Sequence, residues 1–211
     1  MLGTRKISSS KLSFYHSCKK KFARESYLDT VKCFSRRYST TKLRISAHDL
    51  EIEKGRYKNI PRELRVCHWC KTCLGEQIVE DENHVIFDCD LYDNLRSKFI
   101  CSLNSSRNFE GISKITINHS SLKTNLMHLL SPNTVSEISP SIIDQFNQHH
   151  TNLNLKPNTP AYTSLLEARS HIINSVCCFL YRCLDKRWKY LKDFRKSDTR
   201  HLKTIVISIS R

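Results

Sequence analysis

The sequence predicts a mainly α-helical protein. Three observations predict this class: apolar residues recur at spacings of three, four and seven, four cysteines and two histidines crowd residues 67–89, and a region rich in Ser, Asn and Thr precedes a long apolar stripe. We therefore expect short amphipathic helices around a small zinc knuckle, a loosely ordered linker and a long C-terminal helix. The expected segments are a basic helical segment (1–60), the zinc-knuckle module (61–101), a polar, partly disordered linker (102–160), and the C-terminal helix and tail (161–211).

The first segment is expected to contain short amphipathic helices. Serines near its start precede two groups of apolar residues at helical spacing: Leu12, Tyr15 and Phe22, then Tyr27, Val31 and Phe34. Farther along, Leu43, Ala47 and Leu50 also have helical spacing, although Leu43, Ile45 and Ala47 alternate as they would in a strand. We predict a helix here and expect Gly55 to end it.

The cysteine-rich segment follows a break in the pattern at Pro61. Within it, we expect Asp81 to cap a short helix that carries His84. Beyond it, three apolar residues at i, i+4 and i+8 predict an amphipathic helix that leaves the segment: Leu91, Leu95 and Phe99.

Composition separates the linker from the final helix. Residues 102–160 are rich in Ser, Asn and Thr and hold four of the five prolines of the chain. After them, one apolar stripe predicts a single long helix: Leu166, Ile172, Ile173, Val176, Leu180, Leu184, Trp188 and Leu191. Cys177, Cys178 and Cys183 lie on this helix, and we expect them in the core as small hydrophobic residues.

No stretch of the chain predicts secretion or membrane insertion. The first twenty residues lack the apolar run of a secretory signal, and the most apolar run, residues 172–184, is only 13 residues long. A bilayer span needs about 20 apolar residues. The 10 cysteines then indicate reduced thiols or a metal rather than a disulfide framework. We expect an intracellular protein, in the nucleus rather than the cytoplasm, without a membrane partner.

The charge predicts a polyanionic partner. The chain has 35 Lys and Arg against 20 Asp and Glu, a net charge of +15, and residues 1–60 alone carry 15 basic and 5 acidic side chains. Such a surplus favours RNA or DNA through phosphate neutralisation. A solvated helix face is the alternative interpretation of a charge run. The candidate phosphate contacts are Lys19, Lys20, Lys21, Arg36, Arg37, Lys42, Arg44 and Arg56.

The cysteine spacing predicts a metal site. Cys67 and Cys70 form a C-x2-C pair, and 13 residues later His84 and Cys89 form H-x4-C. The first pair presents both sulfurs to one point, and the second closes a tetrahedron from the other side. Three thiolates and one imidazole leave no position for water, which is the mark of a structural rather than a catalytic zinc site. We predict one structural zinc ion per chain.

Other residues of this region have two interpretations each. Cys73 is an alternative ligand, because Cys70 and Cys73 form a second C-x2-C pair. His68 lies inside the first turn, and we expect it to face solvent. Tyr57 and Trp69 are candidates to stack on bases, but packing around the knuckle is the competing role.

Residues 41–95 carry a dense series of motifs: Leu-Arg-x-Ser-x-His, Gly-Arg-Tyr, Ile-Pro-Arg, C-x2-C, Glu-Asp-Glu-x-His and Cys-x-Leu-Tyr. This series resembles the region downstream of the reverse transcriptase domain in polyproteins of non-LTR (LINE-type) retrotransposons. The resemblance implies that Cys67, Cys70, His84 and Cys89 are the zinc ligands, and that the module assists the binding of template RNA or target DNA. The matching positions are Leu43, Arg44, Ser46, His48, Gly55, Arg56, Tyr57, Ile60, Pro61, Arg62, Cys67, Cys70, Glu80, Asp81, Glu82, His84, Cys89, Leu91 and Tyr92.

We expect no polymerase or endonuclease site in this chain. A reverse transcriptase holds two magnesium ions on clustered aspartates, and no Asp-Asp pair occurs in the sequence. The adjacent acids Glu80, Asp81 and Glu82 are expected at a helix start, where they complement the helix dipole. The predicted function is therefore a non-catalytic nucleic-acid-binding fragment of a retrotransposon-derived polyprotein. The alternative is a zinc-stapled protein-interaction module that uses the long C-terminal helix.

Overall fold

The computed structural model describes Tyr15, residues 24–104 and residues 160–209, with the side chains of the last range described at 163, 167 and 170–196. Residues 105–159, which hold most of the predicted linker, lie outside the described residues. The mainly α class is confirmed, and in the described part the β pairing consists of a single bridge, Val66 to Val79. The elements are α2 (Ser26–Thr30), α3 (Phe34–Arg44), α4 (Glu51–Tyr57), the short turns η2 (Arg62–Leu64), η3 (Cys70–Leu74), η4 (His84–Asp88) and η5 (Asp90–Tyr92), α5 (Asp93–Asn104) and α8 (Pro160–Ile209).

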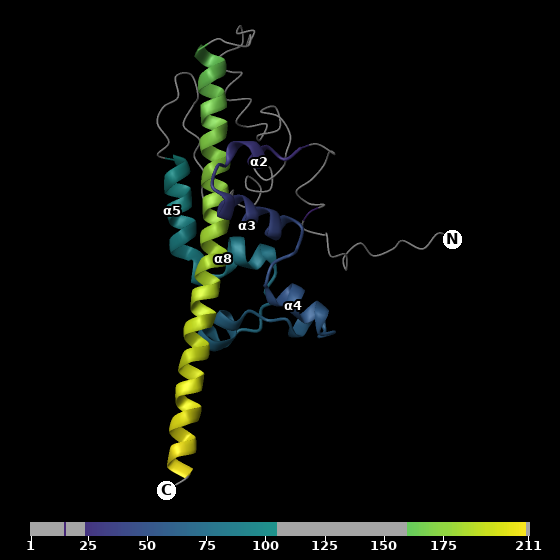
Figure 1. The fold of residues 1–211 in the computed structure, drawn as a ribbon, viewed down its shortest axis with the longest axis vertical. Helices are drawn as coiled ribbons and strands as arrows, with labels where there is room; N and C mark the ends of the chain where they lie inside the picture. The colour runs from purple at the N-terminus through teal and green to yellow at the C-terminus, as the bar shows by residue number, and fades with distance from the viewer. Residues whose placement is uncertain (1–14, 16–23, 105–159, 210–211) are drawn as a thin grey trace, which may run out of the picture.

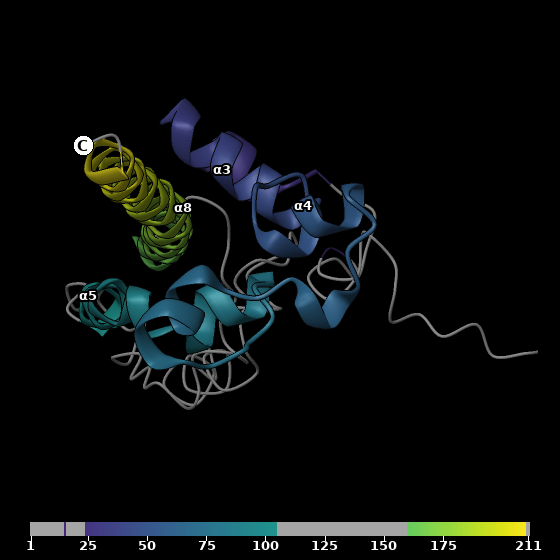
Figure 2. The same ribbon diagram turned by 90° about the horizontal axis from the view of Figure 1, so that it is seen from below.

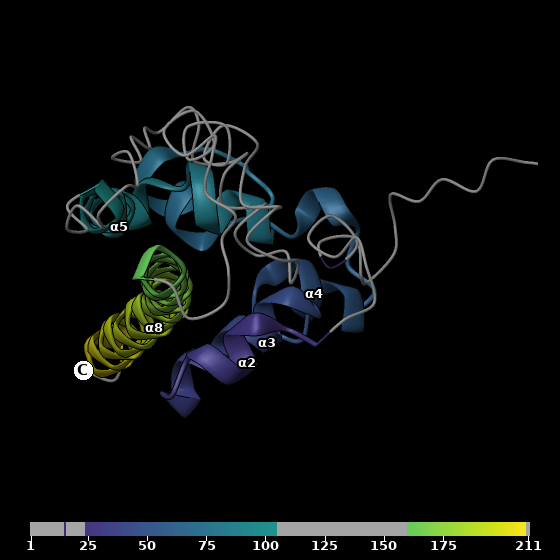
Figure 3. The same ribbon diagram turned by 90° about the horizontal axis from the view of Figure 1, so that it is seen from above.

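The long helix α8 is the axis on which the other elements pack (Figure 1). α5 lies on one side of it and α2 and α3 lie on the other, as the two end-on views show (Figures 2 and 3). Both ends of α8 extend past the other labelled helices (Figure 1). Although α8 has 50 residues, no described helix combines enough length with enough apolar character to cross a membrane.

One large cluster of buried apolar side chains joins these elements. It draws residues from the first, second and fourth predicted segments, so these segments share a core. Phe99 of α5 stacks on Phe179 of α8, with ring centroids 4.7 Å apart and an angle of 7° between the planes. Cys183 belongs to the same cluster, and burial raises the pKa of its thiol to about 12, as expected for an unreactive core cysteine.

A smaller cluster holds α2 against α8. Tyr27 and Val31 pack there with Cys177, whose thiol has a pKa raised by burial to about 11. The chain is extended from Val31 to Cys33, so the predicted apolar group that contains Phe34 does not share one helix face. Phe34 begins α3 instead and is 69% exposed.

The helix predicted around Leu43 does not continue to Gly55. α3 ends at Arg44, Ser46 has a positive φ of 51°, and a new helix, α4, starts at Glu51. The reason is the buried carboxylate of Glu82, which accepts a hydrogen bond from Ser46 Oγ at 2.7 Å and lies 2.9 Å from His48 Nε2. A continuous helix would not deliver both side chains to one acceptor, so the chain leaves the helix here.

Gly55 lies inside α4 and does not end it. α4 continues to Tyr57, and a Cβ added at Gly55 would lie 2.5 Å from Cγ of Arg65. The Arg65 side chain needs this space because its guanidinium donates to the carbonyls of Ile60 at 2.8 Å and Ile52 at 2.9 Å. The glycine therefore permits a close approach between α4 and the chain that enters the cysteine-rich turns.

Candidate metal centre

The first half of the cysteine-rich region is a small hairpin. Val66 and Val79 form the bridge, and the amide of Cys67 donates to the carbonyl of Ile78 at 2.7 Å. Between these strands the chain makes one helical turn that ends at Gly75, whose φ of 74° lets its N–H turn back to the Cys70 carbonyl. This geometry brings the sulfurs of Cys67 and Cys70 to the same side of the hairpin.

The second half is a short helix that ends at Cys89. Asp81 Oδ1 accepts a hydrogen bond from the amide of His84 at 3.0 Å, which confirms the predicted cap. The amide of Cys89 donates to the His84 carbonyl at 2.8 Å, and the buried Arg96 donates to the Cys89 carbonyl at 2.6 Å. These bonds hold His84 and Cys89 on the face that points toward the hairpin.

The four predicted ligand residues meet at one point. Their ligand atoms all lie within 4.8 Å of one another. Cys89 Sγ lies 3.9 Å from Cys67 Sγ and 3.8 Å from Cys70 Sγ, and Cys70 Sγ lies 3.4 Å from His84 Nε2. A regular tetrahedron with zinc–sulfur bonds of about 2.3 Å sets its sulfurs roughly 3.8 Å apart. The atoms are therefore spaced as ligands of one ion.

Burial and charge also suit a cation. Each of the four residues is at most 4% exposed. The hydrogen bond between Cys89 and Cys67 lowers the pKa of Cys67 to about 4, whereas burial raises the pKa of Cys70 to about 12. The same hydrogen bond raises the pKa of Cys89. Without an ion only one thiol is readily ionised, and a bound divalent cation would supply the charge that three thiolates need.

Cys73, the alternative ligand, does not join this cluster. Its side chain is exposed, and its sulfur lies 3.7 Å from Thr72 Oγ1. The helical turn rotates Cys73 away from the face that carries Cys67 and Cys70.

Buried carboxylates flank the cluster. Glu80 receives two hydrogen bonds from Arg187 of α8, at 2.7 Å and 2.6 Å, and one from the amide of Glu51 at 2.8 Å. Burial by itself would raise the pKa of Glu82, but the hydrogen bonds from His48 and Ser46 outweigh it and hold this pKa below its ordinary value. Both carboxylates are thus ionised and paired within the fold.

α8 covers the hairpin with aromatic side chains. His68, which we expected to face solvent, shares a hydrogen bond of 3.0 Å with the Tyr190 hydroxyl, and its ring meets the Phe194 ring edge-on at 4.1 Å. Trp69 also contacts Tyr190, with centroids 5.2 Å apart. The expectation for His68 was wrong because its partners lie more than 120 residues away in sequence.

The predicted phosphate contacts do not form one patch. Lys19, Lys20 and Lys21 lie outside the described residues. Arg44 is 1% exposed and pairs with Glu25 at 3.1 Å, so its role is structural and it is not a surface contact. Arg56 pairs with Glu53 at 2.7 Å, and Arg37 donates to the carbonyl of Val31 at 2.7 Å. Arg36 and Lys42 are partly exposed, and neither forms an ion pair within the described part.

Sequence reasoning missed a second set of basic residues. Lys42 and Lys54 line a cavity together with Lys192, Arg195 and Lys196 of α8. The sequence contained one signal of this set, since residues 161–211 carry 11 basic and 4 acidic side chains. It gave no indication that these residues face α3 and α4.

The chain was compared with known protein families, curated proteins and solved structures, and it matches none of them. The likeness to LINE-type polyproteins therefore stays a prediction that rests on the motifs.

Proposed function

We propose that this chain is a non-catalytic nucleic-acid-binding module held together by a structural zinc ion. One observation carries the proposal: Cys67, Cys70, His84 and Cys89 form a buried cluster with tetrahedral spacing. Three sulfurs and one nitrogen suit zinc, whereas magnesium and calcium take oxygen ligands. With four protein ligands the ion would keep no position for water, so its contribution is to stability.

The non-catalytic half of the proposal is supported by the partners of the acidic residues. Asp81 caps the helix of His84 and pairs with Arg62 at 2.9 Å. Glu80 and Glu82, which lie on either side of it, are bound to Arg187 and to Ser46 and His48. All three acids of the Glu-Asp-Glu-x-His motif thus serve the fold, where a two-metal site would need unpaired carboxylates.

Nucleic-acid binding is supported by the charge of +15 and by the motif resemblance. The origin that we propose for the chain is a LINE-type polyprotein, as the motif series indicates. Several motif positions have clear roles in this fold: Ser46 and His48 bind Glu82, Gly55 makes room for Arg65, and Glu80 anchors α8.

Metal analysis tests the zinc half. Protein purified under reducing conditions should contain about one zinc per chain by mass spectrometry of the metal. Cys89→Ser should lose most of this zinc, and Cys73→Ser, the matched control, should keep it. Metal content near zero in the wild type would refute the site, and full content in Cys89→Ser would refute this ligand set.

Titration of labelled RNA and DNA oligonucleotides over a salt series tests the second half. Binding by phosphate neutralisation weakens linearly in log affinity against log salt. Absence of binding at low salt, or affinity that does not change with salt, would remove nucleic acid from the proposal.

A second candidate is a zinc-stapled protein-interaction module. The observation in its favour is that α8 extends past the other labelled helices at both ends (Figure 1). Charge reversal at Arg36 and Lys42 separates the two candidates. It should abolish oligonucleotide binding if the first is right, whereas unchanged binding would favour the second.

A further inference from the structure

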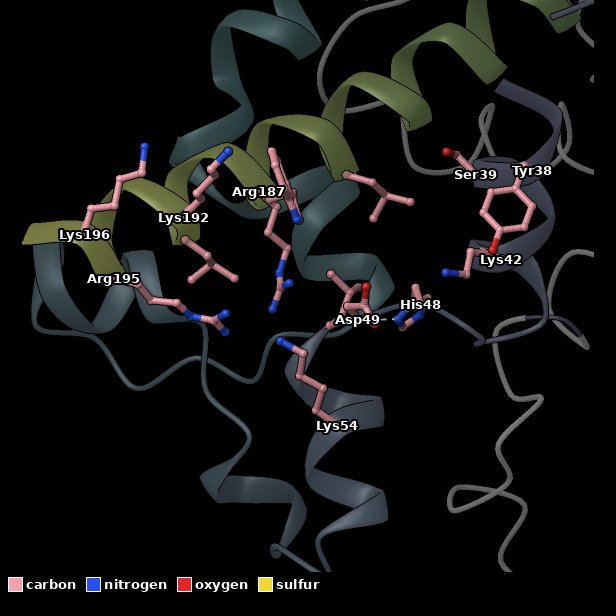
Figure 4. A pocket seen from close by; sticks show the side chains of 14 residues that line it. Tyr38, Ser39, Lys42, His48, Asp49, Lys54, Arg187, Lys192, Arg195 and Lys196 are labelled. Atoms are coloured by element: carbon pink, nitrogen blue, oxygen red, sulfur yellow. Dashed lines mark hydrogen bonds between the residues drawn. The ribbon is translucent and has the colours of Figure 1, made fainter. Parts of the chain in front are cut away.

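A basic groove runs between α8 and the segment that joins α3 to α4. It has a volume of about 710 Å³, and its lining includes six basic residues but only one acidic residue, Asp49. Figure 4 shows that Lys42, Lys54 and Arg195 point into this space from opposite walls. The groove is formed by residues that lie more than 130 positions apart in the sequence.

Part of this charge is already neutralised. Arg187 is buried against Glu80 and Glu51, and Lys54 lies 3.4 Å from a carboxylate oxygen of Glu51. Lys42 and Lys192 form no ion pair with a described residue. Their ammonium groups instead lie over the rings of Tyr38, at 5.0 Å, and Trp188, at 4.7 Å. The groove therefore keeps a net positive charge after its internal pairs are counted.

The aromatic residues of the groove are unusually accessible. Trp188 is 58% exposed and Tyr38 is 51% exposed, although both line the groove. Trp188 belongs by spacing to the apolar stripe of α8, yet it lies outside the core, since the buried part of the helix faces α3 and α5 at other positions. Each ring has a lysine against it, so each aromatic surface lies next to a positive charge.

We propose that this groove binds single-stranded nucleic acid, an inference that rests on the nucleic-acid-binding function proposed above. Lys42, Lys54, Lys192 and Arg195 contact phosphates along the groove, and a base stacks on Trp188. Exposed aromatic rings beside basic side chains are the usual means of binding an unpaired strand without sequence preference. In a duplex the faces of the bases are covered by their neighbours, so Trp188 would have no surface to stack on.

An acidic peptide is the competing occupant. It would use the same cations but would not need an exposed indole ring, so the aromatic residues favour nucleic acid. Two measurements, on charge and on stacking, separate these occupants.

The charge measurement compares two triple variants of the full chain. Lys42→Gln, Lys192→Gln and Arg195→Gln remove groove cations, and Lys32→Gln, Lys58→Gln and Lys71→Gln remove three exposed lysines outside it. Both variants lose the same charge, and zinc content and circular dichroism should match the wild type. For a labelled 20-nucleotide single strand, the groove variant should bind about 10-fold or more weakly, and its salt slope should fall by roughly 2. The control should change far less.

The stacking measurement uses tryptophan fluorescence. The chain has 2 tryptophans, so Trp69→Phe leaves Trp188 alone, and its emission should be quenched by an unlabelled single strand. Trp188→Ala in the wild-type background should weaken single-strand binding about 5-fold to 150-fold, the usual loss for one stacked base, and should change duplex binding little.

The outcomes separate this inference from the proposed function. If the wild type binds no nucleic acid at low salt, both fall. If it binds but the two triple variants weaken equally, the groove is overturned and the function stands. Duplex binding as tight as single-strand binding with no quenching of Trp188 would overturn the choice of an unpaired strand. Displacement of the strand by an equal concentration of polyglutamate would assign the groove to an acidic peptide.

Discussion

The cysteine-rich hairpin and the contact between α5 and α8 bury side chains of opposite character. The hairpin region encloses three thiols, an imidazole and the carboxylates of Glu80 and Glu82. The α5–α8 contact encloses rings and aliphatic groups such as Phe99, Phe179 and Leu180. A polar group buried without a partner destabilises a fold, whereas buried apolar area stabilises it by itself.

The difference teaches that the two regions depend on solution conditions in different ways. The hairpin is stable only while each buried charge has its partner, including the proposed ion. The helical contact needs no ion and should respond mainly to changes in shape and area. Both regions meet on α8, so a change in one can be measured against the other.

The largest expected effect follows metal removal. A chelator should unfold the hairpin, because structural zinc sites in small modules contribute about 10 kcal/mol or more. Hydrogen exchange checks this: the amides of Cys67 and Cys89 should lose protection well before those of α5 around Phe99. Equal loss of protection in both regions would mean that they do not differ in the way described.

Breaking the buried ion pair should have the next largest effect. Arg187→Met leaves Glu80 buried without its counter-charge, and we expect about 3–5 kcal/mol less stability in urea unfolding. The exposed pair of Lys189 with Asp185, 2.8 Å apart, offers a control on the same helix, and Lys189→Met should cause no measurable change. Combining Arg187→Met with Glu80→Gln should recover part of the loss. A loss no greater than that of the control would contradict the role given to this pair.

The aromatic stack tests the other region. Phe99→Leu keeps the site apolar but removes the ring that stacks on Phe179, and we expect a loss of about 1–2 kcal/mol. Zinc content should stay at the wild-type level, since Phe99 does not contact the hairpin ligands. Loss of zinc from this variant would show that the two regions are more tightly coupled than their contacts indicate.

The smallest expected effect is at the helix cap. Asp81→Ala removes the hydrogen bond to the His84 amide and should cost about 1 kcal/mol of stability. Because the cap orients the turn that carries His84, zinc affinity should fall modestly while α5 and α8 keep their stability. Unchanged affinity for zinc in a competition assay with a coloured chelator would show that packing alone orients His84.

Local patterns predicted those parts of the molecule that are local in sequence. The spacing of Cys67, Cys70, His84 and Cys89 identified residues that the structure brings together. The cap at Asp81 and the long helix α8 followed from the same kind of pattern. Each of these features depends on residues within a few helical turns, which periodicity and spacing describe well.

Features that depend on distant partners were not predictable. The chain leaves the helix after Arg44 because Glu82, more than 30 residues later, binds Ser46 and His48. His68 is held by Tyr190, and Trp188 lies in the groove instead of the core. A charge count could not distinguish the buried Arg44 from the partly exposed Lys42, since only the fold assigns Glu25 to the first.

The bond between Arg187 and Glu80 also sets the register of α8. A helix held only by aliphatic side chains can slip by one turn, about 5.4 Å, and repack its ridges at modest cost. Such a slip would withdraw Arg187 and leave Glu80 beside the ligand cluster without a counter-charge. The pair therefore acts as an index pin that fixes how far α8 extends past the hairpin, and with it the alignment of one groove wall against the other.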